Sequence, residues 1–349
     1  MRNKINILLA DLIGDSKGHY YIMQALSILP NSFCVDTKER KILIKANPIK
    51  GILERIRMYQ RVRIQAKKYT GNSIIHFLTS DKIYFIPYCR KLETDNLKIV
   101  ATLHRVPNNF LLKLLLKNFA KKISQIVVLS DSLERRLREL GITNVSTILH
   151  PTFYDYSKFS QKDARLRLGL PCDKIVISAL GGTRFDKGLD ILIDALNGLS
   201  NENKSKVVLN IAGREQDFSK EFIENRLSPS INRNIQLKNL SDDEFCMNVI
   251  SSDWVAVPYR KTFQGVSGPM VEALSQGIPV IVPRMSSLDF FCRQFNGGIK
   301  FNTEDINSLQ DVLTDIATGL KIKVVNTERL SINEFVQSHL NLYMRLYEN

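Results

Sequence analysis

Residues 174–188 of the 349-residue chain read KIVISALGGTRFDKG, and this stretch decides the fold. The apolar residues 174–180 predict a buried strand, two glycines follow it, and a helical pattern begins at Gly188. Glycines let a backbone approach a ligand closely, and the start of a helix attracts anions. Arg184 and Lys187 add positive charge at the same place. The stretch predicts a diphosphate site; the alternative is a tight turn with two solvated cations.

The same alternation of strand and helix extends in both directions from this stretch. Short apolar runs predict strands at residues 5–10, 73–78, 97–103, 126–129, 145–149, 174–180, 207–212, 254–257 and 279–282. Longer patterns predict helices at residues 20–29, 110–122, 132–140, 188–199, 242–250 and 270–275. Continuous apolar strands that alternate with helices indicate parallel sheets covered on both faces.

The length predicts two domains, at about 100–200 residues each. A polar segment with Pro151, residues 150–161, is the expected linker. We therefore expect domains at residues 1–155 and 156–329, each an α/β sheet, with ligands in a cleft beyond the carboxyl ends of the strands.

Composition narrows the class of protein. Hydrophobic residues make up 44% and charged residues 24%, as in ordinary globular proteins. No apolar run is long enough for a transmembrane helix, and the apolar run near the N-terminus is too short for a signal peptide. The five cysteines are scattered without a Cys-x-x-Cys pair, so neither disulfides nor structural zinc are expected. These features favour the cytoplasm.

The net charge of +14 is unevenly distributed. Residues 1–150 hold 26 Lys and Arg against 11 Asp and Glu, whereas residues 151–349 are nearly neutral. This excess suggests a nucleic acid, an anionic membrane or a phosphorylated substrate; the alternative is a solvated basic surface. Residues 49–69 combine apolar side chains at helical spacing with six cations, a pattern that suits an anionic membrane or a solvated domain helix: Arg55, Arg57, Arg61, Arg63, Lys67 and Lys68. Residues 110–122 carry lysines among leucines, and we expect that helix to pack in the core.

A second motif, residues 258–274, reads PYRKTFQGVSGPMVEAL. Ser267 and Gly268 stand where a helix begins, with Pro269 in its first turn, and their N–H groups could hold a phosphate. Glu272 lies about one turn further on, where a carboxylate could accept hydrogen bonds from a ribose diol. The alternative is that Glu272 only complements the positive end of the helix.

Together these motifs resemble the retaining GT-B glycosyltransferases of family 4, which use sugar nucleotides. The resemblance rests on Gly181-Gly182, Arg184, Lys187-Gly188, Ile211-Ala212-Gly213, Ser267-Gly268, Glu272-Ala273 and Gly277-Ile278-Pro279-Val280-Ile281. In the first half, Gly14, Gly18, residues 101–104 (ATLH) and residues 127–133 (VVLSDSL) resemble the family's corresponding segments. The resemblance implies an α/β GT-B fold, in which two Rossmann-like domains face a central cleft. It also implies that a C-terminal helix at about residues 330–349 crosses back to the first domain.

The resemblance also assigns roles to residues. Catalytic roles fall to His104, which would orient the sugar or acceptor, and to Arg184 and Lys187, which would stabilise the leaving diphosphate. Donor-binding roles fall to Gly14, Gly18, Gly182, Gly213, Gln264, Ser267, Gly268 and Glu272. Two positions depart from the family pattern: Gln264 replaces a glutamate that usually contacts the donor sugar, and Arg184 stands two residues after Gly182 rather than directly after it.

The expected protein is a metal-independent hexosyltransferase-type enzyme without a cofactor, because the sequence has no Asp-x-Asp motif. Its expected partners are a nucleotide sugar, a saccharide or lipid-linked acceptor of surface polysaccharide synthesis, and an anionic membrane surface at the inner face of the cell membrane. A sugar-nucleotide epimerase of related fold and a basic nucleic-acid-binding protein are the alternatives. The sequence offers no further acid or base residues for the first, and no aromatic-rich basic motif for the second.

Overall fold

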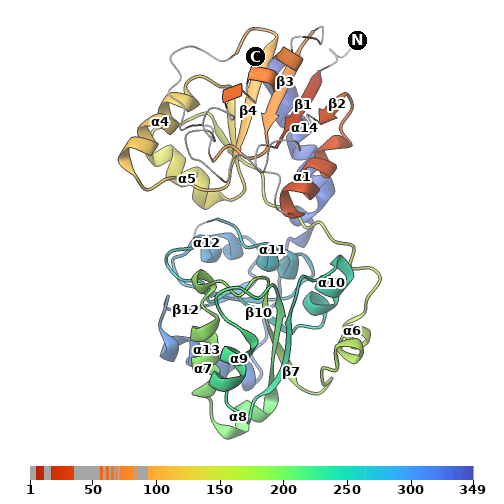
Figure 1. Ribbon diagram of the computed structural model, residues 1–349, viewed down its shortest axis with the longest axis vertical. Helices are drawn as coiled ribbons and strands as arrows, with labels where there is room; N and C mark the ends of the chain where they lie inside the picture. The colour runs from red at the N-terminus through yellow and green to blue at the C-terminus, as the bar shows by residue number, and fades with distance from the viewer. Residues whose placement is uncertain are drawn as a thin grey trace. The chain divides into compact units, whose positions relative to one another are not determined.

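The computed structural model describes residues 5–11, 17–34, 56–57, 60–62, 64–66, 68, 71–81, 84, 93–263 and 265–348 (Figure 1). The chain forms two compact units. Unit 1 comprises Met1–Pro151 and Ile332–Asn349, and unit 2 comprises Thr152–Ser331. These boundaries lie a few residues from the expected ones at 155 and 330. No helix in the described part of the chain is long and apolar enough to cross a bilayer.

Unit 1 contains a parallel sheet in the order β2-β1-β3-β4-β5-β6. Its strands are β1 (Asn6–Ala10), β2 (Ser32–Cys34), β3 (Ser73–Phe77), β4 (Leu97–Leu103), β5 (Gln125–Val128) and β6 (Val145–Thr147). Its helices are α1 (Lys17–Ser27), α4 (Phe110–Ala120), α5 (Asp131–Glu139) and α14 (Ile332–Glu348). β1 and β3 are buried along their whole length, which explains why the sequence shows them as unbroken apolar runs.

The C-terminal helix α14 belongs to unit 1, as expected. Its buried Tyr343 lies 2.5 Å from His76 Nδ1 of β3, and the Tyr347 hydroxyl donates to the Ser73 carbonyl at 2.6 Å. Burial lowers the pKa of His76 and of His339 on α14, so both rings are neutral at pH 7. Neutral rings and tyrosines thus fix the end of the chain to the first sheet.

Unit 2 contains a parallel sheet in the order β12-β11-β10-β7-β8-β9. Its strands are β7 (Ile175–Leu180), β8 (Val207–Gly213), β9 (Asn232–Leu237), β10 (Trp254–Ala256), β11 (Val280–Pro283) and β12 (Gly298–Phe301). Its helices are α6 (Gln161–Leu168), α7 (Leu189–Asn197), α8 (Asn201–Lys206), α9 (Lys220–Arg226), α10 (Asp242–Ile250), α11 (Gly268–Ser275), α12 (Ser287–Arg293) and α13 (Ile306–Ala317), with 3-10 turns η2 (Phe185–Lys187) and η3 (Thr327–Leu330).

The strand order of unit 2 reverses between β7 and β10, because the strands that follow β7 extend the sheet first on one side and then on the other. Ligands of open α/β sheets bind at such a switch point, outside the carboxyl ends of the strands. The switch point of unit 1 lies between β1 and β3 by the same criterion.

Candidate functional site

The glycine turn after β7 brings two strands into direct backbone contact. Gly181 donates its N–H to the Ala212 carbonyl at 2.8 Å, and its φ is +94°. Gly213, at the end of β8, has a φ of +147°, and a Cβ built there would lie 2.2 Å from the Gly181 carbonyl oxygen. A side chain at either position is therefore strained or excluded. The two predicted glycine positions meet at the carboxyl edge of the sheet.

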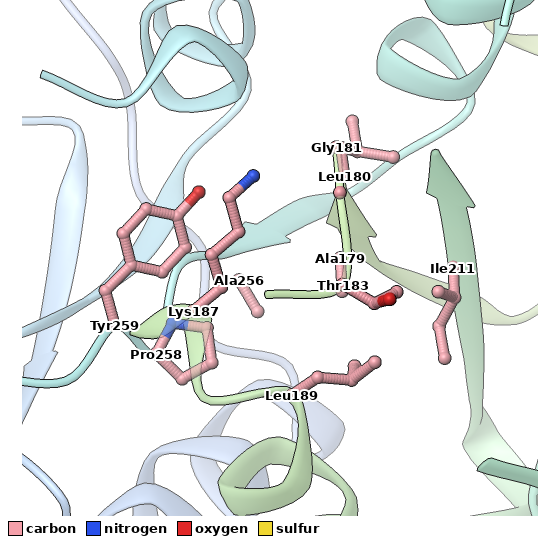
Figure 2. A pocket seen from close by; sticks show the side chains of 11 residues that line it. Ala179, Leu180, Gly181, Thr183, Lys187, Leu189, Ile211, Ala256, Pro258 and Tyr259 are labelled. Carbon is pink, nitrogen blue, oxygen red and sulfur yellow. The ribbon is translucent and has the colours of Figure 1, made fainter. Parts of the chain in front are cut away.

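Lys187 extends to this turn. A Cβ built on Gly181 would lie 2.6 Å from Lys187 Nζ, and the ammonium lies 5.6 Å from the centroid of the Tyr259 ring. Figure 2 shows the lysine side chain running beside that ring. In the described part of the chain no carboxylate pairs with Lys187, and its side chain is half-buried. An uncompensated cation at a switch point is suited to an anionic ligand.

The N-terminus of α11 reaches the same place. Pro269 Cγ would lie 3.5 Å from a Cβ at Gly181. Ser267 caps the helix by accepting from Met270 N, and its hydroxyl is 2.9 Å from that of the buried Tyr259. Since Pro269 has no N–H, Gly268 carries the first-turn N–H for which the described residues supply no acceptor. The N–H of Gly182 also has no acceptor among the described residues. Lys187 and these two N–H groups form a donor-rich edge.

The partly open pocket at this edge has a volume of about 20 Å³ and is lined by residues such as Leu180, Ile211 and Tyr259 (Figure 2). Such a volume holds about one water molecule. A diphosphate would therefore lie over the glycine turn rather than within this cavity.

Arg260 is a residue whose role the sequence did not reveal. Its guanidinium donates to both oxygens of Asp190 at 3.0 and 2.7 Å and to the Phe185 carbonyl at 2.6 Å, and it lies 3.8 Å from the centroid of the Phe185 ring. Its own N–H donates to the Asp186 carbonyl. Arg260 thereby fixes the short turn that carries Lys187. The nearest signal in the sequence is its place four residues after the end of β10, in the loop at the switch point.

Arg184 and Lys187 differ in whether a carboxylate compensates their charge. The exposed Arg184 forms a bidentate pair with Asp186 in the same turn, with two N···O distances of 2.8 Å, and this carboxylate raises its pKa. Its charge is thus compensated where that of Lys187 is not. The sequence assigns both cations to the diphosphate, and the geometry favours Lys187.

Glu272 is held by the segment that opens unit 2. Its carboxylate accepts hydrogen bonds from the Thr152 hydroxyl, from the Phe153 N–H at 3.1 Å and from the Tyr156 hydroxyl at 3.0 Å. The side chain is buried, and burial raises the pKa of Glu272 to about 7, against the lowering effect of these bonds. Within the described residues, three of about four acceptor positions of the carboxylate are occupied, and the fourth is on Oε1.

Two expected donor-binding residues, Gly14 and Gln264, lie outside the described residues. Gly18 is in the first turn of α1, because that helix begins at Lys17 rather than at residue 20.

In unit 1, His104 follows β4 and is oriented by a carboxylate that the sequence did not single out. Asp81 accepts from the backbone N–H groups of His104 and Arg105, and lies 3.2 Å from His104 Nδ1. A proton on Nδ1 in this contact leaves Nε2 as the basic nitrogen. At the switch point of this sheet, Asp11 accepts from the Thr79 hydroxyl at 2.7 Å. The carboxyl edge of unit 1 is thus rich in hydrogen-bond acceptors.

Two parallel six-stranded sheets of Rossmann type, one of them with a donor-rich switch point, define an α/β fold of the GT-B type. Residues 174–318 match the family model of glycosyl transferases group 1. No curated protein matches the chain.

Solved structures match nearly the whole chain. Sucrose-phosphate synthase from Thermosynechococcus elongatus has 14% identity and a TM-score of 0.68, with 99% of each chain covered. A glycosyltransferase from Rickettsia africae ESF-5 has 16% identity and a TM-score of 0.68, with 100% of each chain covered. HepE from Anabaena, in complex with UDP, has 15% identity and a TM-score of 0.69, with 97% of this chain and 99% of that chain covered.

These matches confirm the expected α/β fold of GT-B type. The residues that match the model of glycosyl transferases group 1 all lie in unit 2, and this match supports a glycosyltransferase activity.

Proposed function

We propose that this protein transfers a sugar, with retention, from a nucleoside-diphosphate sugar to a saccharide or lipid-linked acceptor in surface polysaccharide synthesis. The donor-rich edge formed by Lys187, Gly182 and Gly268 carries the proposal. The family match of unit 2 supports it. HepE has been seen with UDP and with UDP-glucose, which supports a nucleotide sugar, and a uridine nucleotide in particular, as the ligand here.

The chemistry follows from charge. Cleavage of a sugar–phosphate bond leaves negative charge on the diphosphate and positive charge on the anomeric carbon. Lys187 and the N–H groups of Gly182 and Gly268 stabilise the leaving group in an arrangement formed before the reaction. Because these donors supply the charge, the proposal needs no metal ion or cofactor. The leaving phosphate accepts the proton of the acceptor hydroxyl.

His104 has a different role in the proposal. Asp81 fixes its orientation, and Nε2 then accepts a hydrogen bond from a hydroxyl of the transferred sugar or the acceptor. Glu272 supplies its remaining acceptor position on Oε1 to the ribose. Gly213 and Ser267 shape the edge, and Gln264 contacts the sugar in place of the usual glutamate. The enzyme would act in the cytoplasm, at the inner face of the cell membrane.

The test is a panel of UDP-, GDP- and ADP-sugars, with release of nucleoside diphosphate as the readout and the anomeric configuration of the product determined by NMR. We expect one nucleotide class to be consumed, the product to retain the donor's configuration, and Lys187→Ala to abolish most of the release. Lys220→Ala, at an exposed lysine of α9, is the matched control. An inverted product would contradict the retaining mechanism, and unchanged release by Lys187→Ala would contradict the assigned site.

A further inference from the structure

Helix α4 of unit 1 has a second apolar face that the core does not cover. Leu116 and Phe119 are buried, and Leu112 packs against the core. Phe110, Leu111 and Leu114, in contrast, are 75%, 62% and 46% exposed. The expectation that this helix packs in the core thus holds for one face only. Figure 1 shows α4 at the left edge of unit 1.

The exposed residues belong to a well-formed helix end. Asn109 caps α4 by accepting from Leu112 N at 3.3 Å, and Lys113 N donates to the Asn109 carbonyl at 3.0 Å. The cap holds the first turn, which presents Phe110, Leu111 and Leu114 to solvent as a defined surface. Three large apolar side chains at one exposed helix start indicate an interaction surface.

The charges around this surface have one sign. Lys113, Lys117 and Lys121 follow at helical spacing, and Lys122 is next to them. The sequence contains no Asp or Glu from residue 96 to residue 130. Within the described residues, none of these four lysines forms an ion pair. An apolar start flanked by unpaired cations matches an anionic lipid surface, whereas a second copy of this face would bring like charges together.

We propose that α4 docks the protein on an anionic lipid bilayer. Phe110, Leu111 and Leu114 enter the interfacial region, and Lys113, Lys117 and Lys121 contact lipid head groups. Membrane docking of this basic unit is an expectation from the sequence, which places it at residues 49–69; the exposed apolar side chains and unpaired lysines place the proposed surface on α4. Of that segment only residues 56–57, 60–62, 64–66 and 68 are described, and Val62 and Ala66 are buried in the core. Arg55, Arg63 and Lys67 lie outside the described residues.

The test is co-sedimentation of the full chain with vesicles of equimolar phosphatidylglycerol and phosphatidylcholine, against vesicles of phosphatidylcholine alone. We expect binding to the anionic vesicles at low salt and little binding to the neutral ones. The triple variant Phe110→Ser, Leu111→Ser, Leu114→Ser should lower the partition coefficient about tenfold or more. Leu166→Ser is the matched control, since Leu166 is 78% exposed on α6 and is also flanked by arginines.

A second pair of variants tests the charges. Lys113→Gln, Lys117→Gln and Lys121→Gln together should remove most of the salt dependence, whereas the same change at Lys162, Lys204 and Lys220 of unit 2 should not. Wild-type protein that stays in the supernatant, or a serine variant that sediments like wild type, would overturn the proposal. So would a wild-type dimer in light scattering that the serine variant converts to monomer. Thermal stabilisation by nucleoside diphosphates, measured without vesicles, tests the proposed transferase separately.

Discussion

The two sheets place opposite chemistry at equivalent positions. In unit 2 the switch point between β7 and β10 presents Lys187 and backbone N–H groups, all hydrogen-bond donors. In unit 1 the switch point between β1 and β3 presents Asp11 with Thr79, and Asp81 with His104 lies beside it. Donors suit phosphate oxygens, whereas carboxylates and a basic imidazole nitrogen suit sugar hydroxyls. The same architecture thus carries opposite hydrogen-bonding groups in its two units, and the residues that follow the strands determine which groups these are.

The largest effect should come from Lys187→Ala. It removes the uncompensated cation of the donor-rich edge. The lost transition-state stabilisation of about 2–4 kcal/mol should lower kcat/KM roughly 30- to 1000-fold. Arg184→Ala should cost about tenfold or less, because Asp186 already compensates that guanidinium. Steady-state kinetics of both variants measure the contrast. Equal losses would mean that Arg184 leaves Asp186 when the donor binds, which would weaken the distinction drawn between the two cations.

Glu272 is a carboxylate in unit 2, so it tests the contrast between the donors of unit 2 and the carboxylates of unit 1. Its pKa of about 7 in the folded protein exceeds the usual 4.5, so its ionisation costs stability as the pH rises between these values. From pH 5 to pH 8 the wild type should lose about 3 kcal/mol relative to Glu272→Gln, which cannot ionise. Urea unfolding of both proteins at the two pH values measures this difference.

Glu244→Gln is the control for Glu272, because the hydrogen bond from Lys238 lowers the pKa of that half-buried carboxyl group. Its stabilising contribution is lost only as the pH falls below about 4.5, so the stability difference between the wild type and Glu244→Gln should be nearly the same at pH 5 and at pH 8. A wild type and a Glu272→Gln variant with parallel pH profiles would show that burial does not hinder the ionisation of Glu272.

Disturbing the close approach of Gly213 to Gly181 should lower the free energy of unfolding by somewhat less than the pH change does at Glu272. Gly213→Ala places a Cβ against a backbone oxygen at a positive φ, and we expect a loss of about 2 kcal/mol, which lowers the unfolding temperature by several degrees. Gly268→Ala should leave the unfolding temperature nearly unchanged, because no atom lies within 4 Å of its Cβ. Differential scanning calorimetry compares them. A Gly213→Ala variant as stable as wild type would show that the β7–β8 approach is loose.

The smallest effect should follow Asp81→Asn. It removes the charged acceptor that orients His104, so transfer should fall about tenfold while affinity for the nucleotide is unchanged. Asp95→Asn, at an exposed turn of unit 1, is the control. Turnover and calorimetric affinity measured together separate the two effects. A loss of nucleotide affinity in Asp81→Asn would contradict the separation of tasks between the units.

Much of the fold is predictable because its central strands are buried on both faces and read as apolar runs. The edge strands β9 and β12 were missed, since β9 reads NRNIQL and is only half-buried. The short polar helices α8 and α9 were missed because they depend on the caps of Ser200 and Ser219 rather than on an apolar stripe.

The candidate site was predictable where it rests on glycine and local sequence, as at Gly181 and Lys187. Pairings over long sequence separations were not. The sequence does not show that Asp186 compensates Arg184, that Arg260 fixes the turn of Lys187, or that Thr152 and Tyr156 hold Glu272. These depend on which side chains the folded strand ends bring together. The sequence also does not show that Phe110 is exposed, because α4 has apolar side chains on both faces and its pattern does not distinguish the face that packs on the core.

The proposed function requires that unit 2 bind the diphosphate at its donor-rich edge. Hydrogen–deuterium exchange with the nucleoside diphosphate that stabilises the protein most tests this binding directly. We expect slower exchange in peptides that cover residues 181–188 and 266–271, no change in those that cover residues 79–81 and 104–106, and loss of the protection in Lys187→Ala. Protection centred on residues 79–81 and 104–106, or protection at the glycine turn that survives Lys187→Ala, would contradict it.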